Sequence, residues 1–157
     1  QEGVIKFLGI PVDGTKQEMI QKLKSKGFTY NQREDALEGE FNGEQVSIQV
    51  QTQNNKVWRL RIFDTEPRSK GQIKIRFNKL VGQFENNGKY TPAKKYQTIS
   101  EYEDIPHEII INDKQYQAVF LSETGGKVWF TIERVIANFR IVMYYENTKN
   151  EADGSDL

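Results

Sequence analysis

Two neighbouring segments of the chain alternate apolar and polar residues, and this pattern predicts the centre of the fold. Residues 45–63 are interpreted as two strands joined by a turn at residues 53–56. Successive side chains of a strand point to opposite faces. One face then collects Val46, Ile48, Val50, Trp58, Leu60 and Ile62. The other face collects Gln45, Ser47, Gln49, Arg59 and Arg61. We therefore predict a hairpin in an antiparallel sheet that is covered on one side only.

Further strands are predicted on both sides of this hairpin. Asn42-Gly43 suits a tight turn, because both residues tolerate positive φ, and it links residues 36–41 to the hairpin. Residues 4–10 form a short apolar run that is either an edge strand or a lead-in packed on the core. Later strands are predicted at residues 107–111, 115–122, 128–135 and 139–146. The sheet is expected to have six or seven strands.

Two helices are expected to cover the apolar face of this sheet. The first helix is predicted over residues 16–26. Thr15 and Glu18 form a capping box at its start, and Gly27 ends it. A second helix lies between Pro67 and Asn86. Its apolar stripe falls within an arc of about 100° and consists of Ile73, Phe77, Leu80, Val81 and Phe84. Ile75 lies off the stripe. The basic residues of this region, Arg76 among them, are interpreted as the solvent-exposed flanks of the helix.

The order of elements predicts an α+β fold with internal repetition. We expect a single domain over residues 1–147, built from two helix-plus-meander units at about 4–64 and 69–147. The segments Lys56-Val57-Trp58 and Lys127-Val128-Trp129 support a duplication. Residues 89–106 are interpreted as a long loop with at most one helical turn, and residues 148–157 as a flexible acidic tail.

Composition narrows the classes of function. The 157 residues suffice for one domain with a real core. Lys plus Arg and Asp plus Glu are equal at 22 each, which argues against nucleic acid as a partner. No apolar run approaches the ~20 residues of a membrane helix, so no membrane insertion is expected. The chain has no cysteine and starts at Gln1, which we interpret as removal of a signal peptide or as trimming.

Three segments carry a resemblance to known proteins. They are residues 7–15 (Phe-Leu-Gly-Ile-Pro-Val-Asp-Gly-Thr), Lys26-Gly27-Phe28 and Val142-Met143-Tyr144-Tyr145. Together they resemble a family of small exported proteins of Bacteroides-type gut bacteria, which implies a periplasmic or secreted location. The repeated helix-and-sheet layout is similar in architecture to β-lactamase inhibitor proteins, in which a concave sheet face grips a partner. Neither resemblance implies a catalytic residue, a metal or a cofactor.

Catalytic chemistry finds little support in the sequence. His107 is the only histidine, and Glu101, Glu103 and Asp104 lie just upstream of it. We interpret this cluster as a solvated loop in preference to an acid–base or metal pocket. No metal-binding, phosphate-binding or nucleophile motif occurs in the chain. An enzyme is therefore not expected.

The polar, solvent-facing side of the sheet is the candidate binding surface. We expect Gln49, Arg59, Arg61 and Tyr144 to contribute to a non-enzymatic, extracytoplasmic binding or inhibitor-like module with a protein partner. The alternative is a carbohydrate-binding accessory protein that uses exposed aromatic rings. The aromatic candidates are Trp58, Trp129, Tyr116, Tyr144 and Tyr145, although the phase of Trp58 with Leu60 favours a place in the core.

Overall fold

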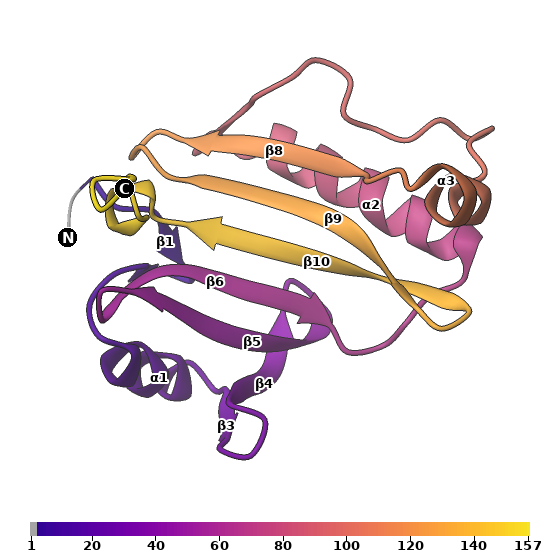
Figure 1. Ribbon diagram of the computed structural model, residues 1–157. Helices are drawn as coiled ribbons and strands as arrows, with labels where there is room; N and C mark the ends of the chain where they lie inside the picture. The colour runs from indigo at the N-terminus through magenta and orange to yellow at the C-terminus, as the bar shows by residue number, and fades with distance from the viewer. Residues whose placement is uncertain (1–2) are drawn as a thin grey trace.

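The computed structural model describes residues 3–157 and has a large antiparallel sheet backed by helices (Figure 1). The helices are α1 (Lys16–Ser25), α2 (Lys70–Glu85) and α3 (Ile105–Asn112), and a 3₁₀ turn, η1, follows at Thr148–Asn150. The first two strands, β1 (Lys6–Phe7) and β2 (Ile10–Pro11), form a small sheet of their own. Gln1, on which the expectation about a leader depends, lies outside the described residues.

The main sheet has eight strands in the order β3-β4-β5-β6-β10-β9-β8-β7. Their bounds are β3 Thr29–Asn31, β4 Ala36–Phe41, β5 Glu44–Gln53, β6 Lys56–Asp64, β7 Tyr90–Pro92, β8 Gln117–Ser122, β9 Lys127–Val135 and β10 Asn138–Glu146. Every neighbouring pair is antiparallel. The α+β class and one large antiparallel sheet are thus confirmed. The sheet has eight strands and not the expected six or seven, because the short edge strands β3 and β7 were not predicted, and the run at residues 4–10 belongs to the separate β1–β2 sheet.

The centre of the sheet joins two distant parts of the chain. Strands β6 and β10 pair with Leu60 opposite Tyr145 and Ile62 opposite Met143. All four side chains are buried. The strand order is symmetrical about this pair, but the two Lys-Val-Trp segments lie on β6 and β9, which are not equivalent in that order. Internal duplication therefore stays a prediction.

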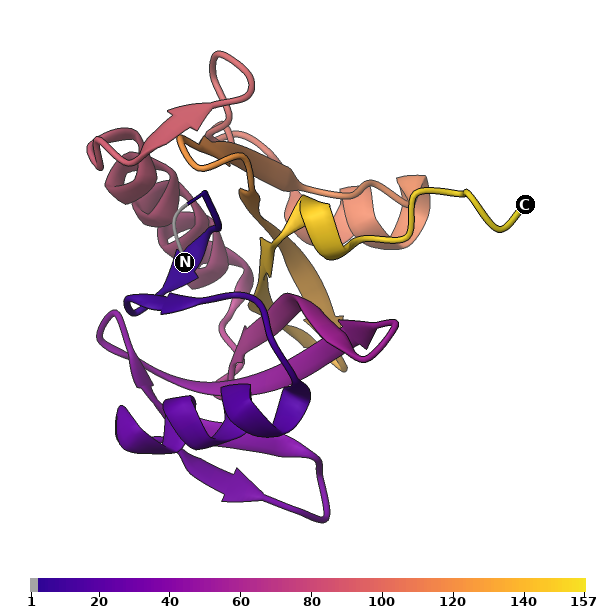
Figure 2. The ribbon, with the colours of Figure 1, turned by 90° about the vertical axis from the view of Figure 1, so that its left-hand side faces the viewer.

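Helices α1 and α2 lie on the same side of the sheet, with the β1–β2 hairpin between them (Figure 2). The predicted stripe of α2 is confirmed, since Ile73, Phe77, Leu80, Val81 and Phe84 are all buried. Ile75 is 70% exposed, as its position off the stripe predicts. The α1 residues Met19 and Leu23 belong to the same hydrophobic core, so one continuous core lies under both helices.

Local sequence signals set the ends of several elements as predicted. Thr15 and Glu18 form the capping box of α1, with Thr15 Oγ1 accepting from the Glu18 amide at 3.1 Å. At the β4–β5 turn, Asn42 and Gly43 have φ of 53° and 81°. These are the positive values that a tight hairpin requires, which is why this pair of residues fits the turn.

The strand predicted at residues 107–111 is wrong, because these residues belong to α3. Asp104 caps the helix by accepting from the His107 amide at 3.2 Å, and Pro106 lies in its first turn. Asp113 ends it in the left-handed conformation, with φ of 52°. The β-branched isoleucines favoured a strand, but capping at both ends and burial of Ile105 against the core outweighed that preference.

Trp58 does not lie in the core as its phase with Leu60 predicted. Gln51 pairs with Arg59 but Thr52 pairs with Val57, so Trp58 is an extra residue in β6. Such a bulge shifts the alternation of side chains by one position. Val57 is consequently fully buried on the helix side, whereas Trp58 is only partly buried.

The interpretation of Arg76 as part of a solvent-exposed flank of α2 is also wrong, because Arg76 is 7% exposed and pairs with Asp64. The predicted loop at 89–106 contains β7 and is held by side-chain amides. Asn78 bonds the backbone of Ile99 through both its amide atoms, at 2.9 and 2.7 Å. In the C-terminal segment, Asn147 is buried and donates to the Val12 carbonyl at 2.8 Å.

Candidate functional site

The sheet face opposite α1 and α2 brings together the residues predicted to bind a partner. Gln49 on β5 and Tyr144 on β10 are the Cα partners of Arg61 on β6, one on each side of it. Arg59 lies two residues before Arg61, so its side chain points to the same face. The four predicted site residues, which come from positions as far apart as 49 and 144, therefore form one neighbourhood in the middle of this open face.

Aromatic rings and a guanidinium group are stacked along this face. The Arg59 guanidinium carbon lies 4.5 Å from the ring centre of Trp58 and 4.6 Å from that of Tyr144. On β9, Trp129 stacks on Tyr144 with ring centres 4.3 Å apart and an interplanar angle of 18°. Stacking of this kind fixes the rings without burying them completely. We call Trp58, Arg59, Tyr144 and Trp129 the stacked row.

Hydrogen bonds hold the two arginines in place. Arg59 donates to Gln51 and, at 3.1 Å, to the carboxylate of Glu146. Arg61 donates to the amide oxygen of Gln49 at 3.0 Å. Because the donors are engaged on several sides, the planes of both guanidinium groups have a defined orientation.

A second group of side chains extends this face toward the β9–β10 turn. Glu133 lies 3.5 Å from Arg61 and accepts from Arg140 at 2.7 Å. The Arg140 guanidinium lies 4.2 Å from the ring centre of Phe63. Phe63 lies two residues after Arg61 and therefore on the same face of β6. The Arg61 guanidinium carbon is 5.0 Å from the ring centre of Phe63.

The face is partly accessible to solvent. The side chains of Arg59 and Arg61 are 25% and 17% exposed, so neither is enclosed by the protein. Glu146 is different, because only 6% of its side chain is exposed although it lies beside Arg59 and Lys127. Glu146 is consequently a structural anchor of this face, and sequence reasoning did not single it out.

The aromatic residues proposed for a sugar platform divide between the two faces. Trp58, Trp129 and Tyr144 belong to the stacked row. Tyr116 and Tyr145 are buried, with 6% and 5% exposure. Burial raises the pKa of the Tyr145 hydroxyl well above its ordinary value, so this residue is neutral in the core. Tyr144 and Tyr145 thus point to opposite sides of β10, as their adjacency predicts.

The acidic residues near His107 serve local structure. The Asp104 carboxylate caps α3, and Glu103 accepts from Lys114 and, at 3.1 Å, from the Tyr116 hydroxyl. Within residues 3–157, no group of three or more His, Cys, Asp or Glu side chains is arranged to hold a metal ion. None of the helices in this part of the chain has the length and apolar character needed to cross a bilayer.

Comparison with known proteins gives no relative for this chain. Scans against protein-family models, curated proteins and solved structures returned no significant match.

Proposed function

We propose that the protein is a non-enzymatic binding or inhibitor-like module that captures a protein partner on its open sheet face. The stacked row supports this proposal. Tryptophan, tyrosine and arginine are the residue types that most often dominate the binding energy of protein interfaces. Here they are held rigid before any partner arrives, which lowers the entropic cost of binding. Export to the periplasm or the medium, implied by the resemblance of residues 7–15, belongs to the same proposal.

The charge of this face defines the partner further. Around the stacked row, arginines 59, 61 and 140 and Lys127 outnumber the carboxylates of Glu133 and Glu146. Two further carboxylates of this face, Glu38 and Glu40, lie apart from the row on β4. A complementary partner presents carboxylates beside an apolar or aromatic side chain. Such a partner gains bidentate hydrogen bonds from the arginines and ring contacts from the stacked row.

A selection from a displayed peptide library tests the proposal. Peptides that bind the wild-type chain are expected to combine Asp or Glu with an apolar residue. Their affinity is expected to fall at least tenfold with the double variant Tyr144→Ser, Arg61→Gln. The matched control is Tyr96→Ser, Arg33→Gln, whose two positions are exposed and lie away from this face. Equal binding to both double variants contradicts the proposal.

The carbohydrate alternative is tested in parallel on a glycan array. The aromatic rings of Trp58 and Trp129 are its only specific support, because sugar rings stack on such surfaces. Glycan binding that is lost in Trp129→Ser, without any acidic peptide in the selection, replaces the protein-partner proposal with this alternative.

A further inference from the structure

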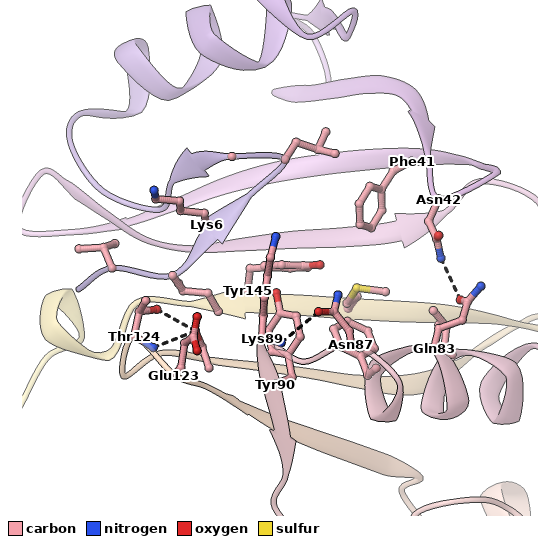
Figure 3. A pocket seen from close by; sticks show the side chains of 18 residues that line it. Lys6, Phe41, Asn42, Gln83, Asn87, Lys89, Tyr90, Glu123, Thr124 and Tyr145 are labelled. Atoms are coloured by element: carbon pink, nitrogen blue, oxygen red, sulfur yellow. Dashed lines mark hydrogen bonds between the residues drawn. The ribbon is translucent and has the colours of Figure 1, made fainter. Parts of the chain in front are cut away.

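A second candidate site lies on the opposite side of the sheet, where the β1–β2 hairpin approaches the end of α2 (Figure 3). It is a pocket of about 590 Å³, a size within the usual range for small-molecule sites. Its walls come from the N-terminal segment, the β4–β5 turn, the last turns of α2, and the loops before β7 and after β8. Strand β10 contributes Met143 and Tyr145. This pocket shares no residue with the stacked row.

The inner surface of the pocket is apolar and adaptable. Leu80 and Phe84 of α2 and Met143 and Tyr145 of β10 are all buried, and Phe41 adds a partly buried ring. A methionine side chain adjusts its shape to a flexible ligand. Burial, and after it the neighbouring Tyr90, raises the pKa of the Tyr145 hydroxyl, so this side chain brings no charge into the pocket. An apolar chain is therefore a suitable occupant of the interior.

The rim of the pocket carries a small excess of positive charge. Lys6, Lys89 and Glu123 line it, which leaves one positive charge uncompensated. None of these three side chains forms an ion pair within residues 3–157. Asn42 and Gln83 close one end of the pocket with a hydrogen bond of 3.0 Å. The cations are thus available to an external anion, and the amides keep that end polar.

We propose that this pocket binds an amphipathic carboxylate of the fatty-acid class. The acyl chain lies against Phe84, Met143 and Tyr145, and the carboxylate lies at the rim near Lys89 and Lys6. Burial of methylene groups supplies most of the affinity, and the ammonium groups select the charge of the head group. The function of the open sheet face does not enter into this proposal.

Titration calorimetry of the full chain with decanoate and dodecanoate, below their aggregation concentrations, tests the site. Saturable binding with one ligand per chain is expected. Two added methylenes are expected to tighten binding about tenfold. Dodecyltrimethylammonium has the same tail and a positive head, and it is expected to bind at least tenfold more weakly than dodecanoate. Absence of saturable binding, or equal binding of the two head groups, overturns the proposal.

Two variants place the ligand in the pocket. Gln83→Trp fills its mouth from α2 and is expected to abolish binding. Ile75→Trp is the matched control, because Ile75 is on the same helix and is 70% exposed. Lys89→Met keeps the apolar stem of the side chain and is expected to weaken the binding of dodecanoate about fivefold. Lys70→Met is the control and is expected to leave that affinity unchanged. If Gln83→Trp does not fold, the Lys89→Met result decides. Unchanged binding in Lys89→Met, or in folded Gln83→Trp, overturns the proposal.

Discussion

Arg76 donates two hydrogen bonds to the carboxylate of Asp64, from Nε to Oδ2 at 3.0 Å and from Nη2 to Oδ1 at 3.2 Å. Both residues are buried, with 7% and 3% exposure. Asp64 ends β6 and Arg76 lies in the middle of α2, so this ion pair fixes the helix against the sheet. Arg68 adds a third hydrogen bond to Asp64 at 2.9 Å, which leaves the carboxylate well satisfied.

Arg76→Met is expected to lower the free energy of unfolding by about 3 kcal/mol, because it leaves a buried carboxylate short of two hydrogen bonds. Urea denaturation measures the change. Adding Asp64→Leu is expected to recover part of the loss, since both charges are then removed. The control Lys70→Met removes an exposed charge from the same helix and is expected to have almost no effect. A loss below about 1 kcal/mol for Arg76→Met would contradict this role.

Arg59 is expected to stabilise the fold in addition to any part it has in binding. Its partner Glu146 is buried, and the only other cation paired with that carboxylate in residues 3–157 is Lys127, at 3.6 Å. Arg59→Met is therefore expected to cost about 2 kcal/mol in urea denaturation. Glu146→Gln in the same chain should reduce that cost, because the uncompensated charge is gone. Arg33→Met, at an exposed position, is the control. An equal cost with and without Glu146→Gln would refute the pairing.

The β9–β10 turn contains a strained residue. Ile136 has φ of 57°, a value that a β-branched residue rarely adopts, and its side chain is 88% exposed. Glycine adopts this conformation freely and is the preferred first central residue of a type II′ hairpin turn. Ile136→Gly is expected to raise the free energy of unfolding by about 1 kcal/mol.

Thermal or urea denaturation measures that gain. Ile111→Gly is the matched control, because Ile111 is also exposed but lies in α3, where glycine is expected to cost about 0.5 kcal/mol. Destabilisation by both changes would show that the Ile136 side chain contributes contacts that outweigh the strain.

Glu103 gives the protein a predictable dependence on pH. The hydrogen bond from Lys114 holds the pKa of the Glu103 carboxyl below its usual value, with a smaller contribution from Tyr116. A carboxyl whose pKa is lower in the folded state stabilises the fold above its unfolded pKa, and this stabilisation disappears as the pH falls through the folded value. Glu103→Gln is therefore expected to destabilise the protein at neutral pH but not in acid.

NMR titration of the Glu103 carboxyl checks the cause. In Lys114→Met, which removes the donor, the pKa of Glu103 is expected to rise toward the ordinary glutamate value. The exposed residue Lys22 offers a control, since Lys22→Met should leave that titration unchanged. A pKa of Glu103 that does not respond to Lys114→Met would assign the shift to another group.

The sequence predicted those elements whose signals are local and mutually consistent. The capping box at Thr15, the Asn42-Gly43 turn and the apolar stripe of α2 all act over a few residues, and all three are confirmed. The helix α3 had signals as well, since Asp104 precedes Pro106 at the spacing of a capped first turn. The isoleucine-rich composition of residues 109–111 concealed those signals, because β-branched residues are typical of strands.

Alternation along β5 and β6 by itself determined that the sheet has one apolar and one more polar face, because residues two apart share a face wherever a strand is regular, which fails only at the Trp58 bulge. It also placed Gln49, Arg59 and Arg61 together. Tertiary structure alone decided the rest. Only the pairing of β6 with β10 brings Tyr144 to Arg59, and only the approach of the N-terminal hairpin to α2 forms the pocket beside Lys89. These contacts join residues far apart in the chain, so no local pattern specifies them.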